Sequence, residues 1–351
     1  MPELRKDPIV GRWVVVDVEN PTLPEEFHLP PFQWKGDKDC PFCYNNEAMT
    51  PPEIEAISEK ERAPNTPGWK VRVVPNKFPA LRIEGDLDKQ GIGLYDFSNG
   101  IGAHEVIIES PQHYKGLDQL SLKEVEYVLK AYRSRSLDLR KDRRFKYILI
   151  FKNVGVQAGA SLEHGHSQLI ALPMVPKNVK EEVKGAKKYY EFRERCIFCD
   201  IIAYELEAGE RIVCENEDFL AFCPLSSRFS FEVWIIPKEH LDDYGMIGDI
   251  KLSNLAQILR EVIGRLHKVL GDHPYNYIIH TSPVNTDSHF SYHWHFEIMP
   301  KLTRVAGFEW GSGFYVVFTP PELAAKYLRE VKLEENSSLK EEGSHGSKSG
   351  D

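Results

Sequence analysis

The sequence predicts an α+β fold built as two tandem halves, each an antiparallel sheet with packed helices. The first observation is an internal repeat: "HEVIIESPQH" at residues 104–113 aligns without a gap with "FEVWIIPKEH" at residues 231–240. The second is that the same elements follow each copy: a helix pattern, a β-rich strand and a strand with alternating histidines. A duplicated domain explains this better than a solenoid, whose period would be far shorter.

Each copy of the repeat is a strand that runs into a turn, and an amphipathic helix follows it. The first helix begins at a capping box formed by Ser121 and Glu124. The apolar residues that recur with helical spacing are Val125, Val128, Leu129 and Tyr132 in the first helix and Leu255, Ile258, Leu259, Val262 and Ile263 in the second. Two sheets, each covered by one such helix, are therefore expected.

The strands after these helices complete each half. They are "FKYILIFKN" and "HGHSQLIALP" in the first half, and "YNYIIHTS" and "HWHFEIMP" in the second. The offset between equivalent residues is nearly constant across the sheet but longer at the Cys-x-x-Cys pairs, which places an insertion before the first sheet. We expect an N-terminal half at 1–176, a C-terminal half at 177–333 and a disordered polar tail at 334–351.

Composition restricts the class of partner. The chain has 351 residues, 42% hydrophobic and 28% charged, as ordinary globular proteins do. A formal charge of -9 argues against a general nucleic-acid or membrane surface. The N-terminus lacks an apolar signal core and no apolar run approaches the length of a membrane span. A cytoplasmic protein that binds a small molecule is expected.

Four of the six cysteines form two Cys-x-x-Cys pairs, "CPFC" and "CIFC", and each pair can supply two thiolates to a tetrahedral zinc site. Histidines at equivalent positions of the repeat complete two ligand sets: Cys40, Cys43, His113 and His164, and Cys196, Cys199, His240 and His293. Closed four-ligand sites leave no position for water, so both Zn²⁺ ions are predicted to be structural. The remaining Cys214 and Cys223 lie in apolar surroundings and are expected to be core thiols.

The metal assignment has alternatives. Either cysteine pair could be a redox dithiol or a pair of buried thiols, and the first site could bind another metal. In the second half, Glu182, His280 and His295 could form a nitrogen and oxygen site that suits iron or zinc. The thiolates of Cys196 and Cys199 favour zinc there, with iron as the alternative for the second half.

His166 is the candidate nucleophile. His164, His166 and Gln168 alternate along a strand and so share a face, which leaves His166 beside a metal-bound neighbour with one ring nitrogen free. The preceding segment supplies small residues and backbone N–H groups that let a phosphate approach: Asn153, Gly155, Gly159 and Ser161. A histidine beside such a cradle can act as a nucleophile, whereas the other interpretation is a structural histidine.

The second half serves as an internal comparison. Its equivalent face carries His293, His295 and Glu297, but bulky Trp294 and Phe296 stand between them and no glycine-rich segment precedes them. We therefore expect a packed strand there and assign the chemistry to His166.

The His164-x-His166-x-Gln168 strand, the glycine-rich segment before it, "CPFC", "NKFPAL" and the duplication resemble the galactose-1-phosphate uridylyltransferase family. This family is the transferase branch of the histidine-triad superfamily, and the resemblance runs from about Glu3 to Val331. It implies two tandem histidine-triad-like halves. It also implies a ping-pong reaction, in which His166 attacks the α-phosphorus of a nucleotide sugar and a second phosphate resolves the nucleotidyl-histidine.

The resemblance further implies substrate contacts and partners. Gln168 would hydrogen-bond a phosphoryl oxygen, Ser161 would hold a phosphate oxygen within the frame of Asn153 and Gly159, Asn76 would contact the ribose, and Glu309 falls in the hexose-contacting segment. The implied partners are an NDP-sugar and a sugar 1-phosphate or phosphate, with a homodimer as the assembly. The leading interpretation is a UDP-glucose:hexose-1-phosphate uridylyltransferase.

Several positions depart from the family pattern. Both prolines of the histidine motif are absent, Asn20 and Leu23 replace two arginines near the phosphates, and Tyr315 replaces a hexose-binding glutamine. Phosphate charge would then fall to Lys77 or Lys152. These departures and the second Cys-x-x-Cys make the chain similar to a sister group, the ADP-glucose phosphorylases. Those enzymes transfer an adenylyl group to phosphate but usually keep the two arginines.

Two other classes compete with a transferase. Histidine-triad hydrolases let water resolve the intermediate, but they carry a third histidine where this chain has Gln168, which cannot supply an acid proton. The other class is a non-catalytic nucleotide-binding module held together by zinc.

Overall fold

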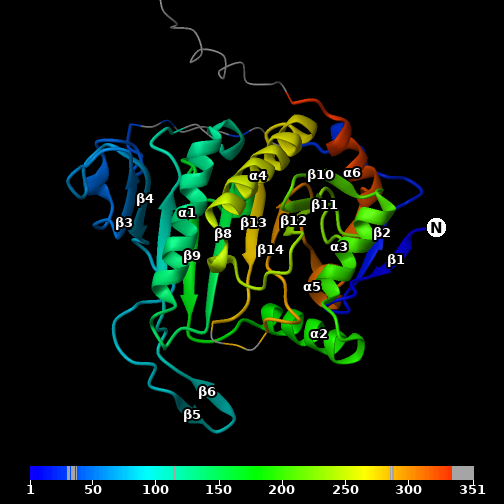
Figure 1. Ribbon diagram of the computed structural model, residues 1–351, viewed down its shortest axis with the longest axis horizontal. Helices are drawn as coiled ribbons and strands as arrows, with labels where there is room; N and C mark the ends of the chain where they lie inside the picture. Colours follow the sequence, from blue (N-terminus) through cyan, green and yellow to red (C-terminus); the bar gives the residue numbers. More distant parts are fainter. Residues whose placement is uncertain are drawn as a thin grey trace, which may run out of the picture.

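The computed structural model describes residues 1–29, 32, 36, 38–113, 116–284, 286 and 288–333, so the tail predicted at 334–351 lies outside the described residues. A ten-stranded antiparallel sheet forms the centre of the molecule (Figure 1). Its strands, in spatial order, are β10 (Ile212–Glu215), β11 (Phe219–Phe222), β12 (Val233–Pro237), β14 (His295–Pro300), β13 (Tyr275–His280), β8 (Tyr147–Val154), β9 (His166–Leu172), β7 (Ala103–Ile108), β4 (Trp69–Pro75) and β3 (Glu55–Ser58).

The two halves join edge to edge within this sheet. Strand β8 of the first half pairs antiparallel with β13 of the second, which places Asn153 opposite Asn276. The sequence predicted a sheet in each half, and the two sheets prove to be continuous. This junction lies next to β9, so residues of the second half reach the surroundings of His166.

Helices α1 and α4 lie side by side across one face of the sheet (Figure 1). The helices are α1 (Leu122–Leu139), α2 (Lys177–Arg193), α3 (Ile197–Ala208), α4 (Asp249–Leu270), α5 (Gly307–Ser312) and α6 (Pro321–Glu330). The predicted capping box begins α1: Ser121 Oγ accepts from the Glu124 N–H at 3.3 Å, and the Ser121 N–H donates to the Glu124 carboxylate at 2.8 Å. The periodic apolar residues of both helices are buried, as predicted.

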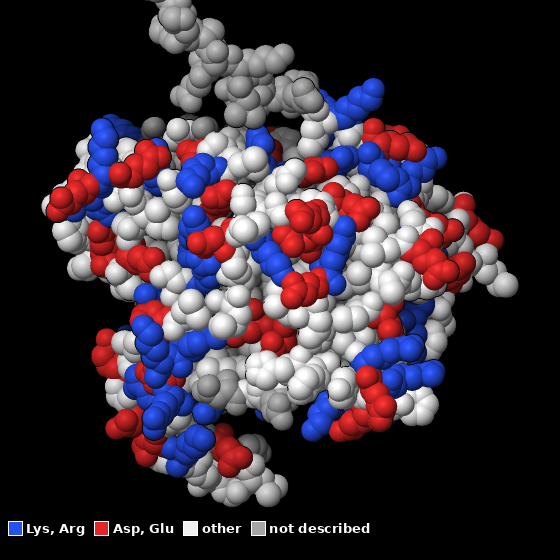
Figure 2. Space-filling view, viewed as in Figure 1, with Lys and Arg blue, Asp and Glu red and all other residues white. Residues whose placement is uncertain are grey.

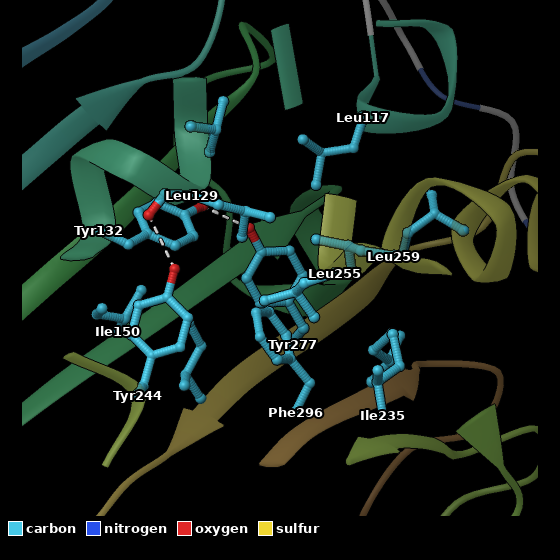
Figure 3. Close-up of a cluster of buried hydrophobic side chains, with 14 of the residues drawn as sticks. Leu117, Leu129, Tyr132, Ile150, Ile235, Tyr244, Leu255, Leu259, Tyr277 and Phe296 are labelled. Carbon is cyan, nitrogen blue, oxygen red and sulfur yellow. Dashed lines mark hydrogen bonds between the residues drawn. The ribbon is translucent and has the colours of Figure 1, made fainter. Parts of the chain in front are cut away.

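The main core fills the space between these two helices and the sheet (Figure 3). Burying each large apolar side chain there contributes about 1.5–3 kcal/mol. Two hydrogen-bonded contacts lie inside the core: the hydroxyls of Tyr132 and Tyr277 lie 2.5 Å apart, and Tyr244 donates to the Leu129 carbonyl at 2.8 Å. Helix α1 is thereby tied both to β13 and to the segment before α4.

The opposite face of the sheet carries the polar groups of interest. Because side chains alternate along a strand, Leu169 of β9 joins the main core while His166 and Gln168 point to the other side. Smaller apolar clusters cover that side, one around Phe42 and Trp69 and one under α3. Two further sheets are made of β1 (Glu3–Lys6), β2 (Trp13–Val16) and β15 (Tyr315–Val317), and of β5 (Gln90–Ile92) and β6 (Tyr95–Phe97).

Acidic and basic side chains are interspersed over the face that carries α1 and α4 (Figure 2). Within the described residues, the helices are all too short or too polar to cross a membrane.

Candidate active site

The first predicted ligand set comes together beside β9. Nδ1 of His164 lies 3.6 Å from Cys40 Sγ and 3.5 Å from Cys43 Sγ, and Nδ1 of His113 lies 3.3 Å from Cys43 Sγ. A zinc tetrahedron with ordinary Zn–S and Zn–N bonds separates sulfur from nitrogen by about 3.6 Å. The four residues therefore fit a tetrahedral metal ion without rearrangement.

The second predicted set has the same geometry. Cys199 Sγ lies 3.4 Å from Nδ1 of His240 and 3.8 Å from Nδ1 of His293, and Cys196 completes a group whose ligand atoms all lie within 4.8 Å of one another. A hydrogen bond from Cys196, followed by the two histidines, lowers the pKa of Cys199. The thiolate, which is the form that binds zinc, is thereby favoured.

Backbone carbonyls orient the ligand histidines. The Nε2–H groups donate to carbonyl oxygens, from His164 to Ser110 at 2.7 Å, from His293 to Pro237 at 2.9 Å and from His240 to His289 at 2.5 Å. A donor bond of this kind fixes the tautomer that turns Nδ1 toward a metal. The two halves thus repeat the ligands, and the equivalent His164 and His293 share the same kind of backbone support.

A third group gathers the nitrogen and oxygen ligands of the second half. His280 Nδ1 lies 3.0 Å from Glu182 Oε2, and its Nε2 lies 3.1 Å from Glu297 Oε2. His295 joins them within 4.8 Å. From the sequence, Glu297 was expected on the same strand face as His295, but it was not included in the predicted nitrogen and oxygen ligand set. Arg228 pairs with Glu297, so part of the acidic charge is already compensated.

His166 lines a cavity of about 740 Å³. Its Nδ1–H donates to the His164 carbonyl at 2.7 Å, which leaves the lone pair on Nε2, and Nε2 makes no hydrogen bond to a described residue. The side chain is 8% exposed, and its ring packs edge-on against Phe42 with the centroids 5.4 Å apart. Burial, helped by the ammonium of Lys152, holds the pKa of His166 below its usual value. The ring is therefore neutral and presents an unprotonated nitrogen.

The β8–β9 turn forms one wall of this cavity. Gly155 has φ +81°, and a Cβ there would lie 2.9 Å from Pro274, so only glycine fits. Ser161 and Asn153 also line the cavity. Asn153 Oδ1 accepts from Asn276 Nδ2 at 2.7 Å, which leaves the Asn153 amide protons for a ligand.

The predicted substrate contacts divide into three groups. Gly159 is not in the cavity lining, but its φ of +88° shapes the turn. Gln168 and Asn76 lie outside the lining too, and both contact His104 of β7, a residue that sequence reasoning did not select. Glu309 lies on α5, which is seen to the right of β14 in Figure 1, whereas β9 lies to the left of β8; its carboxylate accepts from the Ala306 N–H at 2.9 Å.

Lys152 is at the cavity wall, but its charge is already compensated. Its Nζ donates to Glu109 at 2.5 Å and to the His166 carbonyl at 3.1 Å. Glu109 also accepts from Ser167 at 2.9 Å and from Tyr132 at 3.2 Å. This buried network holds the backbone of His166. Lys77, the other lysine proposed from the sequence, does not line the cavity. The exposed Lys38, which was not selected from the sequence, does.

Lys152→Met is expected to lower the free energy of unfolding by about 3–5 kcal/mol, because it leaves the Glu109 carboxylate buried without a counter-charge. Guanidinium denaturation of the two proteins measures this. The double variant Lys152→Met/Glu109→Gln, which removes both charges, should recover most of the loss. An unchanged midpoint in the single variant would show that the pair does not stabilise the fold.

Both halves of the chain match a known protein family. The model of the galactose-1-phosphate uridyl transferase N-terminal domain matches residues 1–176, and that of the C-terminal domain matches residues 182–317. An ADP-glucose phosphorylase of Arabidopsis thaliana is 36% identical over 95% of this chain and 93% of its own. A galactose-1-phosphate uridylyltransferase of Thermotoga maritima is 29% identical over 95% of this chain and 100% of its own.

Solved structures show the same likeness. The crystal structure of the Arabidopsis thaliana ADP-glucose phosphorylase with bound ADP-glucose aligns with a TM-score of 0.80 over 95% of this chain and 100% of its own, at 36% identity. A uridylyltransferase structure aligns with a TM-score of 0.72 over 94% of this chain and 97% of its own, at 28% identity.

Fold, site and relatives together define an enzyme of the nucleotidyltransferase class. Since the two domain models cover most of its length, the chain belongs to the galactose-1-phosphate uridylyltransferase family. The resemblance inferred from the histidine strand and the duplication is thus confirmed.

Proposed function

We propose that the protein transfers a nucleoside monophosphate from a nucleoside diphosphate hexose to a phosphate acceptor through a nucleotidyl-His166 intermediate. The observation that carries this proposal is the unprotonated Nε2 of His166, a residue that lines the cavity. Nε2 forms a bond to the α-phosphorus, and the bond from that phosphorus to the bridging oxygen breaks, which releases hexose 1-phosphate. An oxygen of the acceptor phosphate then attacks the phosphorus and restores the free imidazole.

Neighbouring groups supply hydrogen bonds to the phosphoryl group. Ser161 and the amide of Asn153 line the cavity as donors, and Gly159 holds the turn that presents them. Gln168 follows His166 on the same face of β9 and would donate to a phosphoryl oxygen, where a neutral amide does not repel the anion. Asn76 would contact the ribose. Lys38, an exposed cation in the cavity lining, would meet part of the phosphate charge.

Adenylyl transfer to inorganic phosphate is the first candidate reaction. Support comes from the ADP-glucose phosphorylase that is 36% identical along nearly the whole of both chains, and from the structure of that enzyme with ADP-glucose bound. The uridylyl reaction expected from the sequence, with galactose 1-phosphate as acceptor, is the second candidate. It is supported by the uridylyltransferase that is 29% identical over its full length.

Two structural zinc ions complete the proposed enzyme, one in each Cys₂His₂ set. The ligand spacing in both sets supports zinc, and the group around His280 is the alternative iron site of the second half. When bound, the first ion would hold His164, and through it the turn that leads to His166. A cytoplasmic location remains a prediction.

A homodimer would complete the hexose site. Glu309 lies in the predicted hexose-contacting segment, yet within one chain it does not line the cavity beside His166, and α5 is seen on the far side of β14 from β9 (Figure 1). A second copy would have to supply this segment for it to reach a hexose bound near His166. Light scattering of the purified protein tests the assembly.

Intact-protein mass spectrometry tests the reaction. The protein is mixed separately with ADP-glucose and with UDP-glucose, without acceptor, and is kept at neutral pH to preserve a phosphoramidate. A gain of one AMP that is lost on adding phosphate, with release of ADP, is expected; a gain of UMP instead would assign the uridylyl reaction. Glucose 1-phosphate release without an adduct would indicate a hydrolase, and no reaction with either donor would contradict the proposal.

A further inference from the structure

His104 connects the two predicted substrate contacts that lie outside the cavity. It lies on β7, the neighbour of β9, two residues before the position that is opposite Gln168. Its Nε2 lies 2.8 Å from Gln168 Oε1 and 3.1 Å from Asn76 Nδ2, and its Nδ1 lies 3.1 Å from the backbone nitrogen of Ala80. One ring therefore contacts both amides and a backbone donor.

The backbone contact determines where the ring proton of His104 is. A backbone N–H can only donate, so Nδ1 must accept from Ala80, and in the neutral ring the proton is on Nε2. Nε2–H then donates to Oε1 of Gln168. With its oxygen engaged in this way, the Gln168 side chain directs its NH₂ group away from His104.

Asn76 is oriented in a similar manner. Its Oδ1 accepts from the backbone N–H of Phe78 at 2.9 Å. The single proton on Nε2 of His104 is given to Gln168, so the 3.1 Å approach of Asn76 Nδ2 to Nε2 is a contact between two donors and not a hydrogen bond. The ring therefore accepts from neither amide. Both amides can thus donate hydrogen bonds to a ligand.

We propose that His104 is a positioning residue that sets the direction of the Gln168 amide, so that an N–H rather than a carbonyl oxygen meets the phosphoryl oxygen. This inference rests on the proposed nucleotidyl transfer. An amide rotated by half a turn would place an oxygen against an anionic oxygen and remove a donor, and losing one such donor costs about 10²–10³ in rate. His104 prevents that rotation through a proton whose place is determined by Ala80.

Two conservative variants distinguish the role of Nε2 of His104 from that of Nδ1. Glutamine at position 104 can place an amide N–H where Nε2–H stands, while asparagine reaches only the position of Nδ1. The measurement is the single-turnover rate of adduct formation on His166, with whichever of ADP-glucose and UDP-glucose labels the parent protein. His104→Gln is expected to stay within about threefold of the parent, and His104→Asn to be about tenfold slower or more, as partial loss of one donor requires.

A double-mutant cycle distinguishes positioning from a general structural effect. Because His104 acts through Gln168, adding His104→Asn to Gln168→Ala should not slow the reaction further. Fully additive effects, or a His104→Asn protein as fast as the parent, would overturn the inference. Unfolding midpoints and metal content are measured on the same samples. If His104→Asn is slow and both His104→Asn and His104→Gln have a lowered unfolding midpoint, the slower rate reflects a general loss of stability, which would also contradict the inference. A parent protein that forms no adduct would instead contradict the proposed function.

Discussion

Replacing His166 by alanine is expected to abolish formation of the nucleotide adduct, with a fall in transfer rate of about 10⁴-fold or more. The reason is that His166 lines the cavity with Nε2 unprotonated, since Nδ1–H donates to the His164 carbonyl. Ser161 and Asn153 would remain to bind the donor, so binding should survive the substitution. Intact mass after mixing with donor measures the adduct, and calorimetry measures binding.

His267→Ala provides the matched control, because this half-exposed histidine lies on α4, on the opposite face of the sheet from His166. It should form the adduct at the parent rate. A second variant, His166→Gly, leaves space for a nucleoside 5′-phosphorimidazolide, which should transfer its nucleotide to phosphate. An adduct that persists on the His166→Ala protein would place the nucleophile elsewhere.

Removing the first thiolate pair with Cys40→Ser/Cys43→Ser is expected to remove one zinc ion and to lower Tm by about 10 °C or more. Structural zinc contributes about 10 kcal/mol or more to folding in small domains, and each kcal/mol is equivalent to about 2 °C in a chain of this size. The two cysteines and two histidines come from segments far apart in the chain, so the ion would join them. Elemental analysis should give two zinc ions in the parent and one in the variant.

The duplicated second set offers a comparison within the same chain. Cys196→Ser/Cys199→Ser should also lose one ion and stability, yet protein that stays folded should still form the adduct, because this set lies in the other half of the sheet from His166. Cys223→Ala, which removes a buried thiol outside both sets, should retain both ions. A metal content that is the same in all four proteins would show that the cysteines bind no metal.

The elements with a strong local signal were predictable. The capping box at Ser121 begins α1, and the period of the apolar residues correctly identified the buried faces of α1 and α4. Such signals depend on residues within a few turns of one another, so the sequence itself contains them. Helices α2 and α3 and the small sheet of β1, β2 and β15 were not predicted. The pairing of β2 with β15 joins opposite ends of the chain, and no local pattern reports it.

The two Cys₂His₂ clusters were predictable for a different reason. The same residue types recur at equivalent positions of a duplicated chain, and the structure brings both sets within 4.8 Å. Comparing the two copies of the repeat also distinguished His166, the candidate nucleophile, from its equivalent His295. The ring of His295 is buried beside that of Trp234, with the ring centroids 4.5 Å apart. The roles assigned to His166 and Gln168 remain proposals that the adduct experiments test.

The sequence by itself determined the α+β class, the duplication, both Cys₂His₂ sets and the candidate nucleophile, because each is encoded in residue type and spacing. Only the tertiary structure decided which distant side chains meet. It paired Lys152 with Glu109, placed His104 against Gln168, added Glu297 to the His280 group and separated Glu309 from His166. These contacts depend on the order and register of strands that are far apart in the chain, which a local pattern does not specify.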